Sequence, residues 1–163
     1  MRAYIGIGSN IGRAANVRAA VQALRKHFDS VTLSNVYESQ PIGFEGENFY
    51  NLVAAFDTDE SPEALVAILH DIERQLGRKR STAHFASRTI DLDLLLYGDL
   101  VRDDPALPIP RPEVTEYACV LRPLAELAPE ARHPRSGETF ATLWRRFAKT
   151  VQPRSPVALE LAN

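Results

Sequence analysis

Two aspartates near the middle of the chain are the side chains best suited to chemistry. Residues 88–97 read RTIDLDLLLY, so Asp91 and Asp93 alternate with apolar residues. In a strand both carboxylates lie on one face, with Cα atoms roughly 6–7 Å apart. Their repulsion favours a bound cation, and oxygen-only ligands suit Mg²⁺. The alternative is a solvated strand face, although such a face usually mixes acids with Lys, Thr and Ser.

The surroundings of this acidic pair indicate phosphoryl transfer. The opposite strand face is predicted to be purely apolar, with Ile90, Leu92, Leu94 and Leu96. Just upstream, a basic cluster flanks the polar stretch 81–87 and comprises Arg78, Lys79, Arg80 and Arg88. A mobile arm that closes over a triphosphate is one interpretation of this cluster, and a solvated basic loop is the other. Metal-binding carboxylates beside arginines are typical of phosphoryl-transfer sites.

Three further residues are candidates for substrate contacts. Glu73 lies in the last turn of a predicted helix, where its charge opposes the helix dipole. It is expected to form either an ordinary salt bridge, with Arg74 or Arg78, or a contact to substrate. Phe49 and Asn51 share a predicted strand face, and a ring with an amide suits a flat heterocycle. A core Phe beside a satisfied Asn is the alternative.

Common nucleotide and metal motifs are missing from the sequence. It contains neither a G-x-x-x-x-G-K-[ST] phosphate loop nor a G-x-G-x-x-G dinucleotide motif. The four His residues have no metal-site spacing, and no Cys pairs with them. A nucleotide site in this chain must therefore be assembled from separate side chains.

Composition favours one cytoplasmic domain. The chain has 163 residues, of which 45% are hydrophobic and 25% charged. A net charge of −2 provides no general attraction for nucleic acid, and no stretch approaches a membrane span, so we expect neither partner. Cys119 is the only cysteine, which excludes an intrachain disulfide and favours a reducing compartment. The first residues lack the apolar core of a signal peptide.

Apolar periodicity predicts a β-α-β-β-α-β order. Strands are expected at 2–8, 31–37, 48–57 and 89–97, and helices at about 17–28 and 61–76. This order is typical of a ferredoxin-like α+β sandwich, whose antiparallel sheet carries helices on one face and leaves the other for a site. The Gly- and Pro-rich residues 38–47 are expected to form a ligand-facing loop. Additional C-terminal helices near 113–128 and 138–149 complete one domain over 1–150, followed by a weakly ordered tail over 151–163.

Six motifs, in order from about residue 2 to residue 145, match one enzyme family. They are GSN at 8–10, YESQPIG at 37–43, FYN at 49–51, GRKR at 77–80, RTIDLDLLLYG at 88–98 and PLAELAP at 123–129. Together they resemble the 6-hydroxymethyl-7,8-dihydropterin pyrophosphokinase family of folate biosynthesis. The resemblance implies transfer of pyrophosphate from ATP to the hydroxymethyl group of a dihydropterin, giving AMP and using two Mg²⁺ ions.

The resemblance also implies roles by position. Asp91 and Asp93 would hold both metal ions and, with Arg78 and Arg88, would form the catalytic group. The ATP-binding residues would be Glu73, His84, Arg111 and Tyr117. The pterin-binding residues would be Ser39, Ile42, Phe49, Asn51 and Cys119. Partners are then two small-molecule substrates, and we expect a monomer.

Five positions depart from the family pattern. Arg111 stands where the family usually has His, and Tyr117 where it has Arg at the nucleotide. Cys119 falls at the second ring of the pterin sandwich, usually Phe, while His84 and Phe85 replace an Arg and a Trp of the mobile loop. Two alternatives therefore stay open: a pyrophosphokinase for a related pterin alcohol, and a non-catalytic pterin- or nucleotide-binding module. Nucleic-acid binding through the sheet is disfavoured, because acids on that face repel phosphates.

Overall fold

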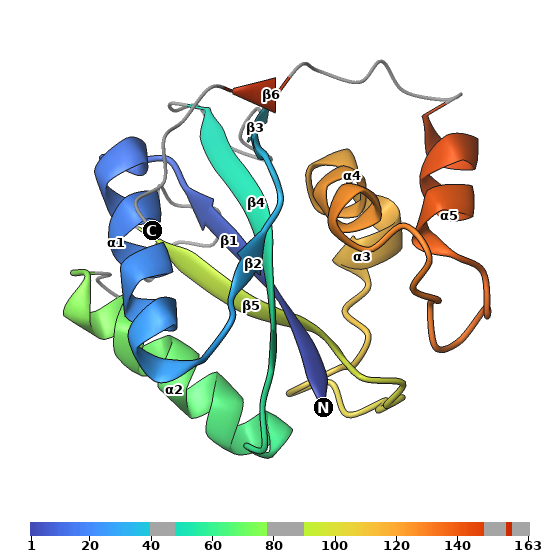
Figure 1. Cartoon of the computed structure of the whole chain (residues 1–163), viewed down its shortest axis with the longest axis horizontal. Helices are drawn as coiled ribbons and strands as arrows, with labels where there is room; N and C mark the ends of the chain where they lie inside the picture. Colours follow the sequence, from blue (N-terminus) through green and yellow to red (C-terminus); the bar gives the residue numbers. More distant parts are fainter. Residues whose placement is uncertain (40–47, 78–89, 149–155, 158–163) are drawn as a thin grey trace.

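A computed structural model describes residues 1–39, 48–77 and 90–148, together with the backbone of 156–157 (Figure 1). In this part of the chain the strands are β1 (Arg2–Ser9), β2 (Thr32–Leu33), β3 (Val36–Ser39), β4 (Phe49–Asp57), β5 (Asp91–Tyr97) and β6 (Pro156–Val157). The helices are α1 (Arg13–His27), α2 (Pro62–Gln75), α3 (Glu113–Glu116), α4 (Ala118–Leu127) and α5 (Phe140–Phe147). The strands form one sheet in the order β5-β1-β4-β3-β6, and β2 also pairs with β4.

The predicted α+β sandwich is confirmed. β1 lies between β4 and β5 and pairs antiparallel with both. The second predicted strand is divided at Ser34 into β2 and β3, which both pair antiparallel with β4. At the break, Ser34 donates its N–H to the Val53 carbonyl, and its Oγ accepts the Val53 N–H, both at 2.9 Å. β3 continues to Ser39, so Glu38 and Ser39, predicted as the start of a loop, belong to a strand, and the rest of the predicted loop lies outside the described residues.

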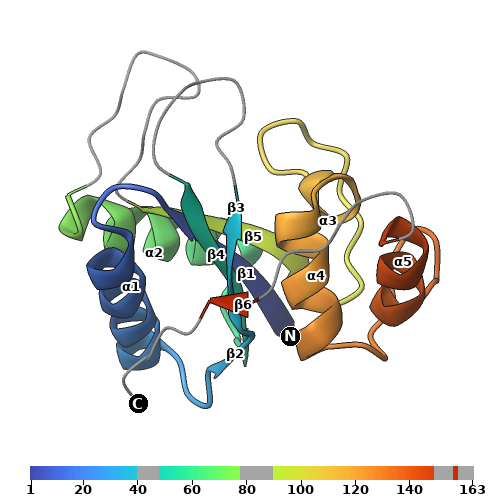
Figure 2. The same ribbon diagram turned by 90° about the horizontal axis from the view of Figure 1, so that it is seen from above.

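Helices cover both faces of the sheet (Figure 2). One core lies between the sheet and the pair α1 and α2, where the rings of Phe28 and Phe56 stack at 4.0 Å between centroids. A second core lies on the opposite face, under α4 and α5, and contains the buried side chains of Leu121, Leu124 and Phe140. The later helices therefore cover part of the face that the predicted fold leaves for a site.

The residues at the two ends of helix α2 are ones that favour the start and the end of a helix. Ser61 caps its N-terminus by accepting the Ala64 N–H on Oγ at 3.1 Å, and Pro62 occupies the first turn. After Leu76, Gly77 takes a φ of 84°, a left-handed conformation that favours glycine and ends the helix. The same residues were predicted to start and stop this helix, and both predictions are confirmed.

A β-bulge in β5 corrects one prediction. β1 pairs Tyr4 with Leu96 but Ile5 with Leu94, so Leu95 is an extra residue that resets the alternation of the strand. Ile90, Leu92 and Leu94 lie in the α1/α2 core as predicted. Leu96 lies with Leu95 in the opposite core, so the prediction that it shares the face of Leu92 is wrong.

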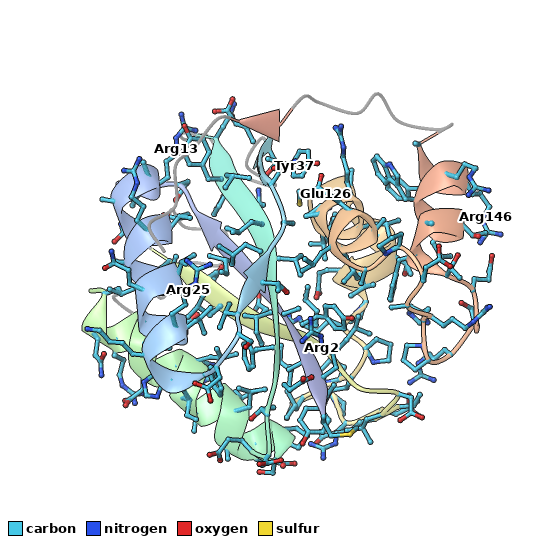
Figure 3. All side chains as sticks on the ribbon, viewed as in Figure 1. Arg2, Arg13, Arg25, Tyr37, Glu126 and Arg146 are labelled. Atoms are coloured by element: carbon cyan, nitrogen blue, oxygen red, sulfur yellow. The ribbon has the colours of Figure 1, made fainter. Side chains whose placement is uncertain are left out.

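Helix α4 is tied to β3 by a small polar cluster (Figure 3). The carboxylate of Glu126 accepts hydrogen bonds from the Tyr37 hydroxyl and from the Asn35 backbone N–H, the second at 2.6 Å. Burial and the Glu126 carboxylate raise the pKa of Tyr37, which keeps the phenol protonated as a donor. These contacts fix α4 over the sheet and so fix the position of the residues at its N-terminus.

The structure describes two residues of the predicted C-terminal tail. Within the predicted tail 151–163, Pro156–Val157 pairs with Val36 and Tyr37 of β3, and the remaining tail residues lie outside the described part.

Among the described residues the longest helix, α1, has 15 residues, and none of these helices has the length and apolarity needed to span a bilayer.

Candidate active site

Five of the predicted site residues line one pocket on the α4 side of the sheet. Phe49 and Asn51 of β4, Asp91 and Asp93 of β5, and Cys119 of α4 surround a cavity of about 100 Å³. These residues are far apart in sequence, and the sheet order places their strands on either side of β1. The predicted shared face of Asp91 and Asp93 is therefore confirmed, because both reach the same pocket.

Two glycines of β1 form the floor of this pocket. Gly6 lies opposite Asp93 on β5 and Val53 on β4, and Gly8 lies opposite Asp91 and Asn51. A Cβ atom at Gly8 would come within 3.2 Å of the Asn51 Oδ1 atom, so a side chain there would intrude on the site. Neither glycine was among the predicted site residues, although Gly-x-Gly inside a buried strand is a signal for close approach of a ligand.

The donor set of the pocket suits a hard divalent cation. Asp91 and Asp93 offer carboxylate oxygens on one strand face beside a cavity. Within residues 1–39, 48–77 and 90–148, no group of three or more His, Cys, Asp or Glu residues is arranged to hold a metal ion. A two-carboxylate set fits Mg²⁺, which commonly takes one or two protein carboxylates and completes its shell with phosphate oxygens and water.

Arg111 lies beside the acidic pair. Its backbone N–H donates to the Leu95 carbonyl of the bulge at 3.0 Å, which joins the chain after the proline-rich loop to β5. Its Nε donates to Glu113 Oε2 at 2.7 Å, and its Nη1 lies 3.9 Å from Asp93 Oδ1. Burial lowers the pKa of Arg111, but the carboxylates of Asp93, Glu113 and Asp91 outweigh this effect and raise it overall. The structure therefore holds a permanent cation next to the two aspartates.

Three predicted pterin-binding residues form a connected wall. Asn51 Nδ2 donates to Ser39 Oγ at 2.6 Å, which links β4 to β3. The Cys119 side chain is hydrogen-bonded to Ser39 as well, and burial raises the pKa of its thiol. Phe49 is only partly buried and lines the same pocket, as a ring that stacks on a ligand requires. Asn51 keeps its Oδ1 atom near Gly8, on the cavity side.

Glu73 supports the site from the opposite side of β5. It is buried, with 4% of its surface exposed, and its Oε2 accepts the Leu92 N–H at 2.8 Å. Arg74, one of the expected partners, pairs with Asp71 at 2.5 Å on the exposed side of α2. Leu92 separates Asp91 from Asp93 in sequence, so Glu73 holds the main chain that carries both carboxylates.

Tyr117 was predicted at the site but is not brought into this pocket. Tyr117 lies at the junction of α3 and α4, is 37% exposed and does not line the cavity. Ile42, Arg78, His84 and Arg88 lie outside the described residues. Conversely, Glu113 lines the pocket but was not among the predicted residues. Glu113 reaches the pocket because the chain before α3 is joined to β5 through the bond between Arg111 and Leu95. No sequence pattern indicated this placement.

Comparison with known proteins identifies relatives over most of the chain. Residues 4–129 match the family model of 7,8-dihydro-6-hydroxymethylpterin-pyrophosphokinase. A 2-amino-4-hydroxy-6-hydroxymethyldihydropteridine pyrophosphokinase of Pseudomonas aeruginosa is 38% identical over 137 residues, which is 82% of this chain and 84% of that protein. The protein of the same name from Bacillus subtilis is 37% identical over 143 residues, covering 84% of each chain.

The fold is also similar to a solved structure. A crystal structure of Plasmodium falciparum HPPK-DHPS with pteroate superposes with a TM-score of 0.73 at 15% identity. The superposition covers 91% of this chain and 43% of that longer one. At this identity the similarity concerns the fold alone.

Proposed function

The chain belongs to the 7,8-dihydro-6-hydroxymethylpterin-pyrophosphokinase family, and on this premise we propose how its residues perform the reaction. The enzyme transfers a pyrophosphoryl group to the hydroxymethyl group of 6-hydroxymethyl-7,8-dihydropterin in folate biosynthesis, with ATP as donor and AMP as the second product. One observation carries the assignment of roles: the acidic pair Asp91 and Asp93 lines the same cavity as Phe49 and Asn51. An acidic edge suited to a cation therefore lies beside a surface suited to a heterocycle.

Asp91 and Asp93 are proposed to hold two Mg²⁺ ions together with the nucleotide phosphates. Bound there, the ions would supply Lewis-acid neutralisation of the charge that develops on the phosphates. The carboxylate of Asp93 is also proposed to help remove the proton of the attacking primary alcohol. Positioning and charge neutralisation should nevertheless supply most of the rate, because phosphoryl transfer needs little covalent help from protein.

Cationic side chains are proposed to bind the phosphates of ATP. Arg111 contributes from the loop before α3, where its Nη1 atom faces Asp93. Arg78, His84 and Arg88 are assigned the same task by their sequence positions. Glu73 and Tyr117 are proposed to contact the nucleoside, and for Glu73 this role would be shared with its bond to β5.

The pterin is proposed to lie against β4 and the N-terminus of α4. Phe49 offers one stacking face, and Asn51 offers an amide that Ser39 already orients. Cys119 lines the same cavity, so this chain offers a thiol where the family usually offers a second ring. That substitution specifically supports a related pterin alcohol as an additional substrate. Ile42 is assigned to the pterin pocket by its sequence position alone.

The direct test is to incubate the protein with ATP, Mg²⁺ and 6-hydroxymethyl-7,8-dihydropterin and to measure AMP. AMP is expected in equal amounts with the pterin diphosphate. AMP no higher than in a mixture lacking protein would contradict the proposal. A parallel series of pterin alcohols tests which acceptors the enzyme uses. Tight nucleotide binding without AMP formation would instead support a non-catalytic binding module.

The setting of the enzyme is also proposed from its sequence. We infer a cytoplasmic protein, because the single cysteine favours a reducing compartment, and we propose that it is a monomer with one domain over 1–150. Size-exclusion chromatography with light scattering tests the monomer. A stable dimer at micromolar concentration would contradict it.

A further inference from the structure

Glu113 is the carboxylate of the pocket that the roles above leave unused. It is the first residue of α3 and is separated from Arg111 only by Pro112. Its Oε2 accepts the Nε–H of Arg111 at 2.7 Å, a charge-assisted hydrogen bond of ordinary length. The same guanidinium approaches Asp93 only to 3.9 Å, which is beyond direct hydrogen-bonding distance.

These distances show how the guanidinium is oriented. The Arg111 main chain is joined to β5 by its bond to Leu95, and its Nε is occupied by Glu113. With its main chain and its Nε both held, the guanidinium directs Nη1 toward Asp93. An arginine side chain without the second attachment has many rotamers, and the nearest strong acceptor would be the Asp93 carboxylate.

We propose that Glu113 is a positioning residue for pyrophosphoryl transfer, which holds Arg111 toward the phosphates and out of hydrogen-bonding distance of Asp93. Without this restraint, the Arg111 guanidinium forms a two-point ion pair with Asp93 and competes with Mg²⁺ for that carboxylate. The inference depends on the proposed function, because it assumes that Asp93 is a metal ligand.

The test measures binding rather than turnover. Isothermal titration calorimetry with a non-hydrolysable ATP analogue, at several Mg²⁺ concentrations, is applied to the full chain and to Glu113→Gln. The substitution keeps the size of the side chain and removes its charge. We expect about a tenfold rise in the Mg²⁺ concentration needed for half-maximal binding, a loss typical of residues that orient metal-site groups.

A second experiment distinguishes competition between Arg111 and Mg²⁺ from a general disturbance of the site. In an Arg111→Ala background, Glu113→Gln should leave the Mg²⁺ requirement unchanged, because the competing cation is gone. Glu116→Gln, an exposed carboxylate on the same short helix, serves as the matched control and should behave like the unsubstituted chain. Circular dichroism melting of each variant checks that the fold is retained.

The outcomes are distinct. An unchanged Mg²⁺ requirement in Glu113→Gln, or an equal rise in the Arg111→Ala background, would overturn the role of Glu113 and leave the proposed function standing. If the unsubstituted chain binds the analogue without any dependence on Mg²⁺, the proposed function fails, and the inference fails with it.

Discussion

The buried carboxylate of Glu73 accepts the backbone N–H of Leu92 at 2.8 Å, across the contact between α2 and β5. β5 is the edge strand of the sheet, so one side of its main chain has no neighbouring strand within the described residues. Edge N–H groups that are buried need another acceptor, and Glu73 provides one. The bond lies between Asp91 and Asp93, so the same residue that stabilises the edge also orders the site.

Removal of this acceptor should therefore affect both stability and binding. Glu73→Ala is expected to lower the free energy of unfolding by ~1–3 kcal/mol, the cost of a buried polar group that loses its partner. It should also weaken Mg²⁺-dependent nucleotide binding. The matched control is Asp71→Ala, whose 59% exposed carboxylate pairs with Arg74 on the surface of the same helix and should cost less than ~1 kcal/mol. Urea unfolding measures both, and equal losses would contradict the structural role of Glu73.

Asp93 should be essential for activity and dispensable for folding. Its side chain is 46% exposed, while its neighbours Leu92 and Leu94 carry the core contacts of β5. Asp93→Ala is expected to lower the rate of AMP formation at least ~100-fold, because charge neutralisation at the phosphates contributes several kcal/mol. The melting temperature should stay within a few degrees of the unsubstituted value. Unfolding of this variant at room temperature would show that Asp93 is structural.

The thiol at position 119 should limit pterin affinity. Cys119→Phe is expected to tighten binding of the dihydropterin by ~2–10-fold, since an added stacking contact contributes ~0.5–1.5 kcal/mol. Calorimetry with the pterin in the presence of the ATP analogue and Mg²⁺ measures this change. Cys119→Ala removes the thiol without adding a ring and should show no gain. A gain in both variants would indicate that the thiol itself is unfavourable.

Buried His133 should make the fold sensitive to mild acid. Its Nδ1 accepts the backbone N–H groups of Arg135 and Ser136 at 3.2 and 3.4 Å, which requires the neutral ring. Burial, followed by the charge of Arg135, lowers its pKa from 6.5. Below that value the unfolded chain binds a proton that the folded chain does not, so unfolding becomes more favourable as the pH falls toward the folded pKa.

The measurement is the free energy of unfolding between pH 7.5 and pH 5.5. We expect the free energy of unfolding to fall over this range, because the unfolded chain protonates His133 at a higher pH than the folded chain does. His133→Gln should abolish that part of the slope, although it is less stable at every pH. His70→Gln, on the exposed side of α2, is the control and should keep the full slope. An unchanged slope in His133→Gln would exclude this residue as the source.

Local patterns of the sequence were sufficient for much of the fold. The alternation in residues 90–94 correctly places Asp91 and Asp93 on one face, because side-chain direction in a strand depends only on neighbouring residues. Ser61, Pro62 and Gly77 correctly mark the ends of α2 for the same reason. The alternation fails at Leu96, because the bulge arises from pairing with β1. The sequence of β5 alone does not specify how the two strands pair.

The site itself was only partly predictable. The residue types of the acidic pair, of Phe49 and Asn51, and of the family motifs were enough to determine the class of chemistry. Only the tertiary structure brought Arg111 to Asp93, Glu113 to Arg111, and Cys119 to Ser39. These contacts join segments that are distant in sequence or separated by a turn, and their distances depend on how α3 and α4 pack on the sheet. Side-chain chemistry is thus local information, whereas the relative placement of those side chains is a property of the folded chain.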